Sequence, residues 1–408
     1  MSEYSGALPI PSASRELSCR VAIVGVGETD YHLGYKAARS KAPGYQPPTP
    51  ESLTKTAFER ALADSGLRRH DIDGLSVSFI YGGPSPQATA QLLGIEPGLF
   101  VEQATSIMAG PLPIACAAIA SGKCDTVAMV YAAASRAIGR QYGGRTYEGA
   151  AGMPTSYYYY HPWGWSSQAA HWALVWQYYM AAYGATEEDL GSVAIQVRKN
   201  ATANPNAVMQ TPLSMADYLS SRYIVRPLHL FDLCLVNDGA VCLILRRADK
   251  ARNLPHAPVL VAGWGESKTK NSKLHTLVRE RLRPQAQDAG QQALGMAGLS
   301  LSDIQHFEGY DASTIHLISQ LEGYGFVEPG AGLDFCKSGE MGIGGSLPVN
   351  TSGGILSESY MHGWNHVAEI VRQLRHEAGA RQIDDVETSM FSLAQTDQVH
   401  PLIFRRGA

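Results

Sequence analysis

Short apolar runs alternate with longer amphipathic segments along this chain, a pattern typical of an α/β protein. The run at 21–26 predicts a buried strand. Residues 49–66 predict a helix, because Thr49 is a good N-cap, Pro50 suits the first helical position and Gly66 suits the end. Further strands are predicted at 75–80, 126–131, 236–245, 259–263, 304–308 and 385–393, and further helices at 111–121, 284–297 and 364–379. This alternation favours a mainly parallel sheet with helices on both faces.

The chain carries nearly the same pattern twice. Residues 21–29 and 259–267 are both apolar runs that end in Gly-x-Gly-Glu followed by Thr or Ser. Residues 61–67 and 293–299 also match, and each segment leads to an Asp-Ile pair. Repeats this long are whole βαβ halves and not the short units of a solenoid. Because a site often lies where two such halves meet, the loops between them are the first place to look for chemistry.

The repeat divides the chain. We expect a flexible N-terminus at 1–18, an N-terminal half at 19–250 and a C-terminal half at 255–408. Residues 136–225 interrupt the first half and have no counterpart in the second. The aromatic side chains of this insertion, concentrated at 157–183, have two interpretations. They form a surface for a bulky apolar ligand, or they serve helix packing or a subunit interface, which is the commoner use of such residues.

Composition excludes several classes of function. The 408 residues carry a net charge of −4 and no basic block, so we expect no nucleic-acid partner. No apolar stretch approaches the ~18 residues of a membrane helix, and no leader pattern opens the chain, so we expect a cytoplasmic protein that does not bind membranes. The six cysteines form no C-x-x-C pair and are expected to be reduced thiols.

Several familiar motifs are incomplete or absent in this chain. Gly25-x-Gly27 follows a strand but lacks the third glycine of a dinucleotide fingerprint. The chain has neither a phosphate-binding Gly-x-x-x-x-Gly-Lys-Ser/Thr loop nor a Gly-x-Ser-x-Gly elbow. His362 and His366 lie four apart on a predicted helix, but no third ligand is evident, so we expect no metal.

Three segments carry a family resemblance: Glu308-Gly-Tyr-Asp311-Ala-Ser-Thr, Leu347-Pro-Val-Asn-Thr-Ser-Gly-Gly354-Ile-Leu-Ser-Glu-Ser-Tyr-Met-His-Gly363, and Pro227-Leu-His-Leu-Phe-Asp-Leu-Cys-Leu-Val-Asn-Asp-Gly-Ala240. They resemble the thiolase superfamily, most closely its sterol-carrier or lipid-transfer branch. The resemblance covers nearly the whole chain. It implies an α/β thiolase-like fold with two duplicated mixed-sheet βαβ halves, in five α-β-α-β-α layers, and an inserted loop domain.

The chain departs from that family at each catalytic position. A thiolase of this branch uses a nucleophilic cysteine, an activating histidine and a second cysteine. The nucleophile's place falls near Thr105 and Ser106, the histidine's place reads Tyr360, and the last strand at 390–397 has no cysteine. The upstream Asn or His reads Tyr310. Acyl transfer through a cysteine is therefore not expected.

Tyrosines at two former catalytic positions are similar to a narrower family, the thiolase-like aldolases that shorten steroid side chains. This resemblance implies retro-aldol cleavage of a bulky 3-hydroxyacyl-CoA to a ketone plus acetyl- or propionyl-CoA. It implies a coenzyme A thioester as substrate and no permanently bound cofactor. It also implies a homodimer, and a heterotetramer with an acyl-CoA-binding partner that has an OB fold and a zinc ribbon.

The chemistry is compatible with these residues. A retro-aldol step needs a base for the β-hydroxyl, stabilisation of the enolate and a proton for the enolate carbon. We expect Tyr310 and Tyr360 to share the base and acid roles, although lowering a phenol's pKa by about three units costs ~4 kcal/mol. Backbone amides around Ser106 (with Thr105) and Gly354 are candidates for the enolate site, and His362 for polarising a tyrosine.

Two alternatives stay open. One is a conventional acyl-CoA C-acyltransferase, a thiolase that uses an unrecognised cysteine. The other is a non-catalytic scaffold that binds acyl-CoA or lipid. The aldolase is favoured because a decayed site would collect arbitrary residues, whereas two phenols are a chemically coherent replacement.

Overall fold

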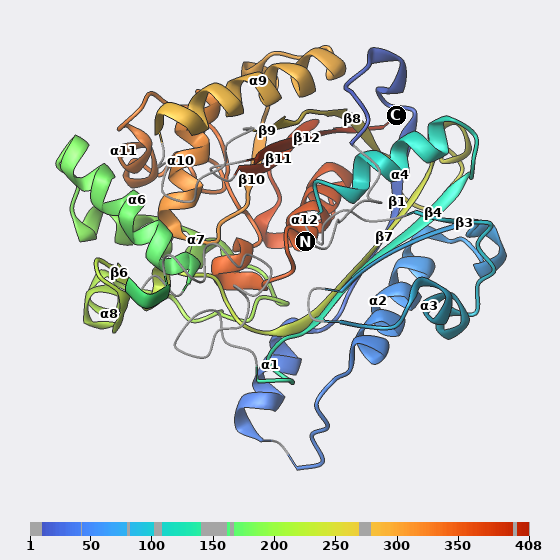
Figure 1. The fold of residues 1–408 in the computed structure, drawn as a ribbon, viewed down its shortest axis with the longest axis horizontal. Coiled ribbons are helices and arrows are strands. Elements are labelled where there is room, and N and C mark those ends of the chain that lie inside the picture. The colour runs from blue at the N-terminus through green and yellow to red at the C-terminus, as the bar shows by residue number, and fades with distance from the viewer. Residues whose placement is uncertain are drawn as a thin grey trace.

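The computed structural model describes most of the chain (Figure 1). The described residues are 10–41, 43–79, 82–101, 108–139, 161–163, 167–268, 279–394 and 398–407. Thr105, Ser106 and part of the aromatic insertion lie outside these ranges.

Strands from both halves join in one 10-stranded sheet, in the order β10-β11-β12-β8-β1-β7-β4-β2-β3, with β9 paired to β12. A separate two-stranded ribbon, β5-β6, begins at the end of the insertion and extends beyond it. The strands are β1 (Val21–Glu28), β2 (Gly74–Phe79), β3 (Leu99–Phe100), β4 (Thr126–Ala134), β5 (Tyr223–Val225), β6 (Leu228–His229), β7 (Asp238–Arg247), β8 (Val259–Trp264), β9 (Ser267–Lys268), β10 (His306–Gly309), β11 (Thr388–Ala394) and β12 (Gln398–Arg406).

The prediction of a mainly parallel sheet is wrong. β2 pairs in parallel with β3 and β4, and β10 with β11, but β1, β7, β8 and β12 pair antiparallel with their neighbours. A strand that is buried on both faces reads as a continuous apolar run in either direction, so the sequence pattern could not distinguish the two arrangements. The mixed sheet implied by the family resemblance is the correct one.

The helices are α1 (Tyr31–Ser40), α2 (Pro50–Ser65), α3 (Pro86–Leu93), α4 (Pro111–Ala120), α6 (Gln168–Tyr183), α7 (Glu187–Thr202), α8 (Met215–Ser220), α9 (Arg279–Ala297), α10 (Thr314–Tyr324), α11 (Gly332–Lys337) and α12 (Trp364–Arg375). α2 begins as its sequence predicts: Thr49 and Ser52 form a reciprocal capping box, and Gly66 ends the helix with a φ of 68°. Among the described helices, none is both long and apolar enough to cross a membrane.

The elements stack in five layers (Figure 1). α2 covers one face of β1, β4 and β7, and α9 covers β8 and β12. Between the two halves lie α4, which packs on β1, β4 and β7, and α12, which contacts strands of both halves. The insertion adds α6 and α7, both of which contact α10 of the second half. The segment that follows β10 is therefore enclosed by both halves and by the insertion.

The repeated Gly-x-Gly motif serves close packing between a strand and a helix. A Cβ atom at Gly27 would lie 2.1 Å from the carbonyl oxygen of Ala57 in α2. A Cβ atom at Gly265 would lie 2.0 Å from the carbonyl oxygen of Ala289 in α9. The motif recurs because both halves bring the same helix against the same strand end, and this contact requires glycine.

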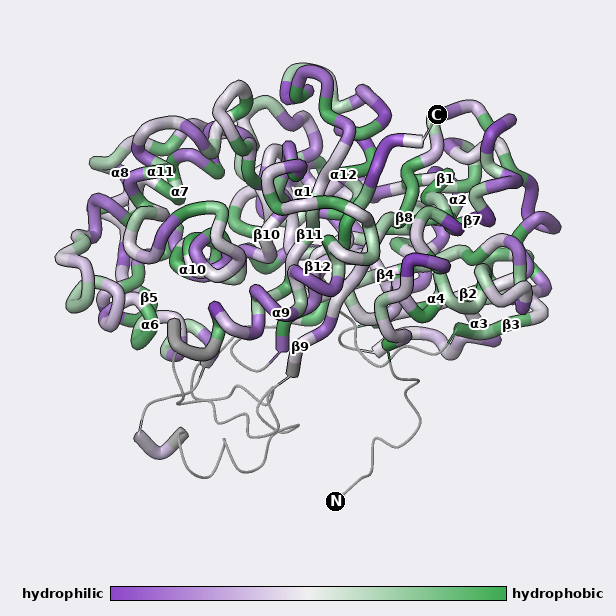
Figure 2. The backbone as a smooth tube through the Cα atoms, turned by 90° about the horizontal axis from the view of Figure 1, so that it is seen from above, coloured by the Kyte–Doolittle hydropathy of each residue, from purple (hydrophilic) through white to green (hydrophobic). Residues whose placement is uncertain are grey.

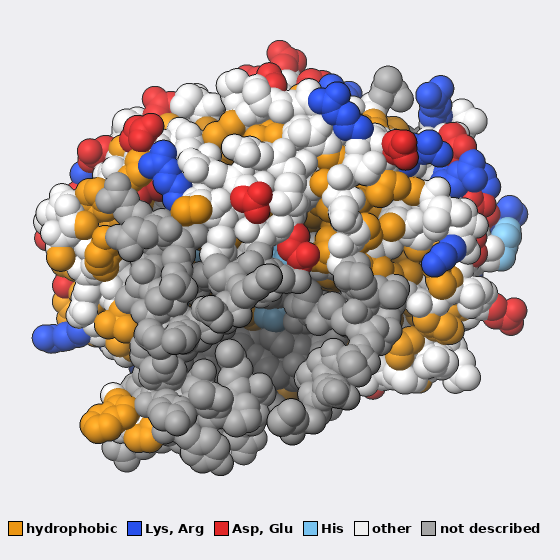
Figure 3. All heavy atoms as spheres, turned by 45° about the horizontal axis from the view of Figure 1, so that its top comes forward, with side chains coloured by type: hydrophobic (Ala, Val, Ile, Leu, Met, Phe, Trp, Pro, Cys, Tyr) orange, Lys and Arg blue, Asp and Glu red, His pale blue; other side chains and the backbone are white. Residues whose placement is uncertain are grey.

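Both faces of the central strands are covered. Every residue of β1 and of β4 is buried, and Figure 2 shows hydrophobic residues along these strands and hydrophilic stretches on the outer turns. The face in Figure 3 mixes acidic and basic side chains among the hydrophobic ones. Such a surface fits the small net charge of −4.

Candidate active site

The two tyrosines predicted from sequence lie together. Tyr310 directly follows β10, and its backbone N–H donates to the carbonyl oxygen of Ser392 in β11 at 2.9 Å. Tyr360 follows a turn of π-helix, Gly354–Glu358. The phenol oxygens are 3.2 Å apart, within hydrogen-bond reach. Tyr310 is 3% exposed and Tyr360 is 9% exposed, so both phenols are largely removed from water.

His362 extends this pair into a row of three polar groups. Its Nε2 lies 2.8 Å from the phenol oxygen of Tyr360. Burial lowers the pKa of His362 to about 3, so the imidazole is neutral at physiological pH. Its ring stacks on Tyr131 at 5.5 Å between centroids and meets the ring of Tyr360 edge-on at 5.0 Å. A neutral imidazole held in this way can accept a hydrogen bond from the Tyr360 phenol.

The backbone at His362 is also unusual. His362 has a φ of 49° and Gly363 a φ of 86°, both in the left-handed region. The His362 carbonyl oxygen accepts a hydrogen bond from the Met108 N–H at 3.2 Å. The chain two residues after Ser106 therefore reaches this site, although Thr105 and Ser106 themselves lie outside the described residues.

The Asn-x-x-Gly-Gly turn fixes the end of β10. The side chain of Asn350 accepts from the Gly309 N–H at 2.8 Å and donates to the Gly309 carbonyl oxygen at 2.9 Å. Gly354 has a φ of 53°, and a Cβ atom there would lie 2.2 Å from Oδ2 of Asp311. Glycine at this position lets the turn approach the carboxylate that follows Tyr310.

The Asp311 carboxylate accepts hydrogen bonds from the two backbone amides that follow Gly354. It accepts from the N–H groups of Ile355 at 2.9 Å and Leu356 at 3.3 Å. Those two amides are therefore engaged by the protein itself. The enolate-binding role that we predict for this turn stays a prediction for the amide of Gly354.

A buried charge cluster lies behind the tyrosines. His366 Nδ1 is 2.6 Å from Glu308 and its Nε2 is 3.1 Å from Asp311. Burial alone would lower the pKa of His366, but its bonds to Asp311 and Glu308 raise it to about 10. Burial would raise the pKa of Glu308, but its bonds from His306 and His366 lower it to about 2. His366 is thus an imidazolium that ties α12 to the end of β10.

The two histidines that are four apart in sequence have separate functions. His362 lies before α12 and faces the phenols, whereas His366 lies within α12 and faces carboxylates. Within the described ranges, no group of His, Cys, Asp and Glu side chains has the arrangement of a metal site.

One neighbour of Tyr310 was missed from sequence. The ring of His316 in α10 meets that of Tyr310 edge-on at 6.0 Å and stacks on Trp172 at 4.1 Å. Its Nε2 bonds the carbonyl oxygen of Ala394 at the end of β11. Burial lowers the pKa of His316 to about 3. In the sequence, His316 is only a histidine shortly after Tyr310, and this spacing does not indicate a site residue. The tertiary structure does, because α6 places Trp172 against the His316 ring.

Five of the cysteines have little thiolate character: Cys116, Cys124, Cys234, Cys242 and Cys336. Burial raises the pKa of Cys336 to about 11 and that of Cys124 to about 12. Cys234 is near the site, since its N–H donates to the carbonyl oxygen of Ala312, but burial and the Asp311 charge raise its pKa to about 12. Burial also raises the pKa of Cys116 and Cys242. These thiols are poor candidates for a nucleophile.

The C-terminal part of the chain matches a known protein family. Residues 267–395 match the family model described as Thiolase C-terminal domain-like. The fold and this match define a member of the thiolase superfamily.

Two related proteins and one solved structure identify the family within this superfamily. The chain is 35% identical over 367 residues to the steroid side-chain-cleaving aldolase of Thermomonospora curvata, covering 87% of this chain and 90% of that protein. It is 35% identical to the 17-hydroxy-3-oxo-4-pregnene-20-carboxyl-CoA lyase of Mycobacterium tuberculosis, covering 88% and 92%. A solved structure of the Ltp2-ChsH2(DUF35) aldolase superposes with a TM-score of 0.82 at 32% identity, covering 96% and 98%. The chain belongs to the thiolase-like, steroid side-chain-cleaving aldolases, and it is a carbon–carbon lyase.

Proposed function

We propose that this aldolase splits a bulky, steroid-like 3-hydroxyacyl-CoA with a tertiary alcohol into a ketone and either acetyl-CoA or propionyl-CoA. Two relatives at 35% identity support this substrate class, since one is named for steroid side-chain cleavage and the other as a carboxyl-CoA lyase. The CoA thioester is the substrate, and the reaction balances without a permanently bound cofactor.

In the proposed step, the β-hydroxyl loses its proton and its oxygen becomes the ketone oxygen. The bond between the α- and β-carbons breaks, and its electron pair enters the thioester as an enolate. A proton delivered to the α-carbon then gives the short acyl-CoA. No acyl group is attached to the protein at any stage, so no nucleophile is required.

The observation that carries this proposal is the buried row Tyr310–Tyr360–His362. We assign Tyr360 as the base: it accepts the β-hydroxyl proton while passing its own proton to Tyr310 across the 3.2 Å contact. Tyr310 gives its proton to the α-carbon, so both phenols end the cycle protonated. His362 stays neutral and holds the Tyr360 phenol through its Nε2, 2.8 Å away.

Substrate contacts complete the assignment. We propose that backbone amides of Ser106 and Gly354 hold the enolate oxygen, with Thr105 beside them. A donor of this kind is typically worth about 100- to 1,000-fold in kcat. In this assignment His362 does not touch the substrate and acts through Tyr360.

We further propose that the chain acts in the cytoplasm as a homodimer. A heterotetramer with an OB-fold and zinc-ribbon protein is the form that we expect to be active. The two-part name of the Ltp2-ChsH2(DUF35) aldolase supports a partner protein, since it names a second component.

The test is incubation with a branched 3-hydroxyacyl-CoA, with and without the candidate partner, before and after alkylation with iodoacetamide. We expect ketone and short acyl-CoA in equal amounts, at a rate that survives alkylation. Loss of activity on alkylation, or a trapped thioester adduct, would favour a thiolase. Binding without ketone release would favour a scaffold.

A further inference from the structure

The motif at 227–240 contributes no group to the proposed proton transfers, although it carries part of the family resemblance. Its Asn237 lies directly before β7, in the first half of the chain. Asn237 is 1% exposed, whereas asparagine side chains mostly face water. Because a buried amide is normally hydrogen-bonded, its partners indicate what it does.

The side chain of Asn237 bonds the turn that carries Tyr360. Its Oδ1 accepts a hydrogen bond from the Tyr360 N–H at 2.8 Å, and its Nδ2 donates to the Ser359 hydroxyl at 2.8 Å. Nδ2 also donates to the carbonyl oxygen of Asp238 at 3.1 Å. Asn237 and Tyr360 are 123 positions apart in the chain, so this contact joins the two halves directly at one of the phenols.

Asn237 is itself held by strands of the first half. β4 and β7 pair up to Asp238, which lies opposite Ala134. Oδ1 of Asp238 accepts hydrogen bonds from the N–H groups of Arg136 at 2.7 Å and Ala137 at 3.0 Å, just beyond β4. A group that is supported by strands is placed more precisely than one on a free loop. The end of the sheet therefore gives Asn237 a rigid base.

The turn around Tyr360 has a conformation that its own residues do not favour. His362 has a left-handed φ of 49°, which is unfavourable for a residue that carries a Cβ atom. Contacts from outside the turn must therefore stabilise it, and the bond from the Tyr360 N–H to Asn237 is one of them. Loss of this bond would let the Tyr360 phenol move relative to Tyr310.

We propose that Asn237 is a positioning residue: it holds the backbone of Tyr360 so that the phenol stays within reach of Tyr310. The inference rests on the proposed function and adds a residue to its site. Asn237 touches no reacting atom and transfers no proton in this scheme. A displacement of about 1 Å at a reacting group can cost about 100-fold in rate, so this hydrogen bond has a large effect on kcat.

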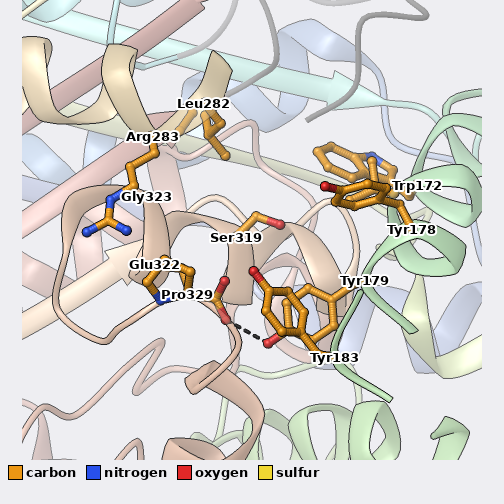
Figure 4. Close-up of a pocket in the computed structure, with 12 residues that line it drawn as sticks. Trp172, Tyr178, Tyr179, Tyr183, Leu282, Arg283, Ser319, Glu322, Gly323 and Pro329 are labelled. Carbon is orange, nitrogen blue, oxygen red and sulfur yellow. Dashed lines mark hydrogen bonds between the residues drawn. The ribbon is translucent and has the colours of Figure 1, made fainter. Parts of the chain in front are cut away.

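The aromatic insertion supports the other phenol. Trp172 stacks on His316, whose ring meets Tyr310 edge-on. These two rings separate Tyr310 from the pocket in Figure 4, which encloses about 40 Å³, room for a few water molecules and not for a bulky ligand. Tyr179, also at this pocket, is buried and donates to Glu322 at 2.6 Å. Trp172 and Tyr179 therefore serve helix packing, the commoner of the two interpretations of the insertion.

Steady-state kinetics with the branched 3-hydroxyacyl-CoA tests the proposal. Asn237→Ala removes the acceptor of the Tyr360 N–H, so kcat should fall about 100-fold while KM stays within about threefold. Asn237→Asp keeps an oxygen at nearly the same position, so its kcat should stay within about tenfold of the parent. Asn206→Ala is the matched control: Oδ1 of Asn206 accepts from the N–H of Tyr31 at 2.9 Å, outside the row of three, so kcat should stay within about threefold.

A double-mutant cycle separates positioning from general structural damage. If Asn237 acts through Tyr360, Asn237→Ala should add less than about threefold to the loss in kcat caused by Tyr360→Phe. Two losses that multiply would overturn the proposal. So would parental kcat in Asn237→Ala, or a kcat in Asn237→Asp as low as that of Tyr360→Phe.

Crystal structures of the parent and of Asn237→Ala give a readout that needs no turnover. The phenol oxygens of Tyr310 and Tyr360 should stay in contact in the parent and separate beyond about 3.6 Å, outside hydrogen-bond reach, in the variant. An unchanged separation would overturn the proposal. If Asn237→Ala does not fold, Asn237→Leu replaces it, because leucine keeps the volume and lacks the acceptor. If the parent cleaves no 3-hydroxyacyl-CoA, the proposed function fails, while the separation still decides whether Asn237 positions Tyr360.

Discussion

At the scale of single residues, the site depends on phenols in contact with each other and with a neutral imidazole. The 3.2 Å and 2.8 Å contacts of Tyr360 place it between a second phenol and a hydrogen-bond acceptor. Tyrosine is ordinarily a donor at neutral pH. In the proposed step, the neutral His362 holds the Tyr360 phenol, which passes its proton to Tyr310 as it accepts another.

The first prediction concerns these phenols. Tyr310→Phe and Tyr360→Phe should each lower kcat by about 100-fold or more, because each removes a group that transfers a proton. KM should change little, since the ring remains. Steady-state kinetics with the branched 3-hydroxyacyl-CoA measures both quantities.

A matched control is available nearby. Tyr324 is also buried, and its phenol bonds the Ser392 hydroxyl at 2.7 Å, but it lies outside the row of three. Tyr324→Phe should keep parental kcat within a fewfold. Parental rates in both Tyr310→Phe and Tyr360→Phe would show that the role assignment is wrong.

At the scale of elements, the turn between Asn350 and Tyr360 positions the site. It binds the end of β10 through Asn350 and presents Gly354 to the Asp311 carboxylate. Neither contact is local in sequence, although both use residues that the family resemblance had singled out.

The second prediction concerns this turn. Gly354→Ala should lower the free energy of unfolding by at least about 3 kcal/mol, because a left-handed φ costs about 1–2 kcal/mol and the clash with Asp311 adds an overpacking cost. Gly379→Ala is the control: its φ is 65°, and a Cβ atom there meets nothing within 4 Å. It should lose only about 1–2 kcal/mol. Urea unfolding measures both, and equal losses would contradict the proposed clash.

At the scale of the whole molecule, buried titratable groups make stability depend on pH. The pKa of His316 and of His362 is about 3 in the folded protein, well below the ordinary value of 6.5. As the pH falls below 6.5, the unfolded chain takes up protons at these residues that the folded chain does not. Glu308, with a pKa of about 2, acts in the same direction below pH 4.5.

The third prediction is a loss of stability as the pH rises from 6.5 to 9. Below pH 6.5 the two histidines alone would remove up to about 2.7 kcal/mol per pH unit as the pH falls. Glu358, with a pKa of about 8, and Asp232, with a pKa of about 6, oppose them, because burial keeps protons on these carboxyls that the unfolded chain gives up. On the alkaline side, His366 has a raised pKa of about 10, so its contribution is complete below pH 6.5 and is lost as the pH rises toward 10. Urea unfolding at pH 5, 6.5 and 9 measures the curve.

Variants separate these contributions. His316→Gln should lower the slope of the free energy of unfolding against pH, between pH 5 and 6.5, by up to about 1.4 kcal/mol per pH unit, whatever its effect at pH 6.5. An unchanged slope between pH 5 and 6.5 would contradict the assignment of a neutral buried His316.

The positions of the main strands and of many helices could be predicted from the chain alone, because apolar periodicity and capping residues act locally. The sequence located α2 with its cap, β1 and the glycines of both repeats. The resemblance to side-chain-cleaving aldolases, carried by short motifs, is confirmed by relatives at 35% identity. That the candidate site carries two phenols could therefore be predicted from the sequence before any contact was known.

Which strands pair, and in which direction, became clear only from the packed molecule, since a strand that is buried on both faces has the same sequence pattern in either direction. Only it revealed β12, the imidazolium between Glu308 and Asp311, and the stack of Trp172 on His316 against Tyr310. The partners in these contacts lie on separate elements, most of them far apart in the chain. Their geometry, and the burial that sets the pKa values, exist only after the halves and the insertion have packed together.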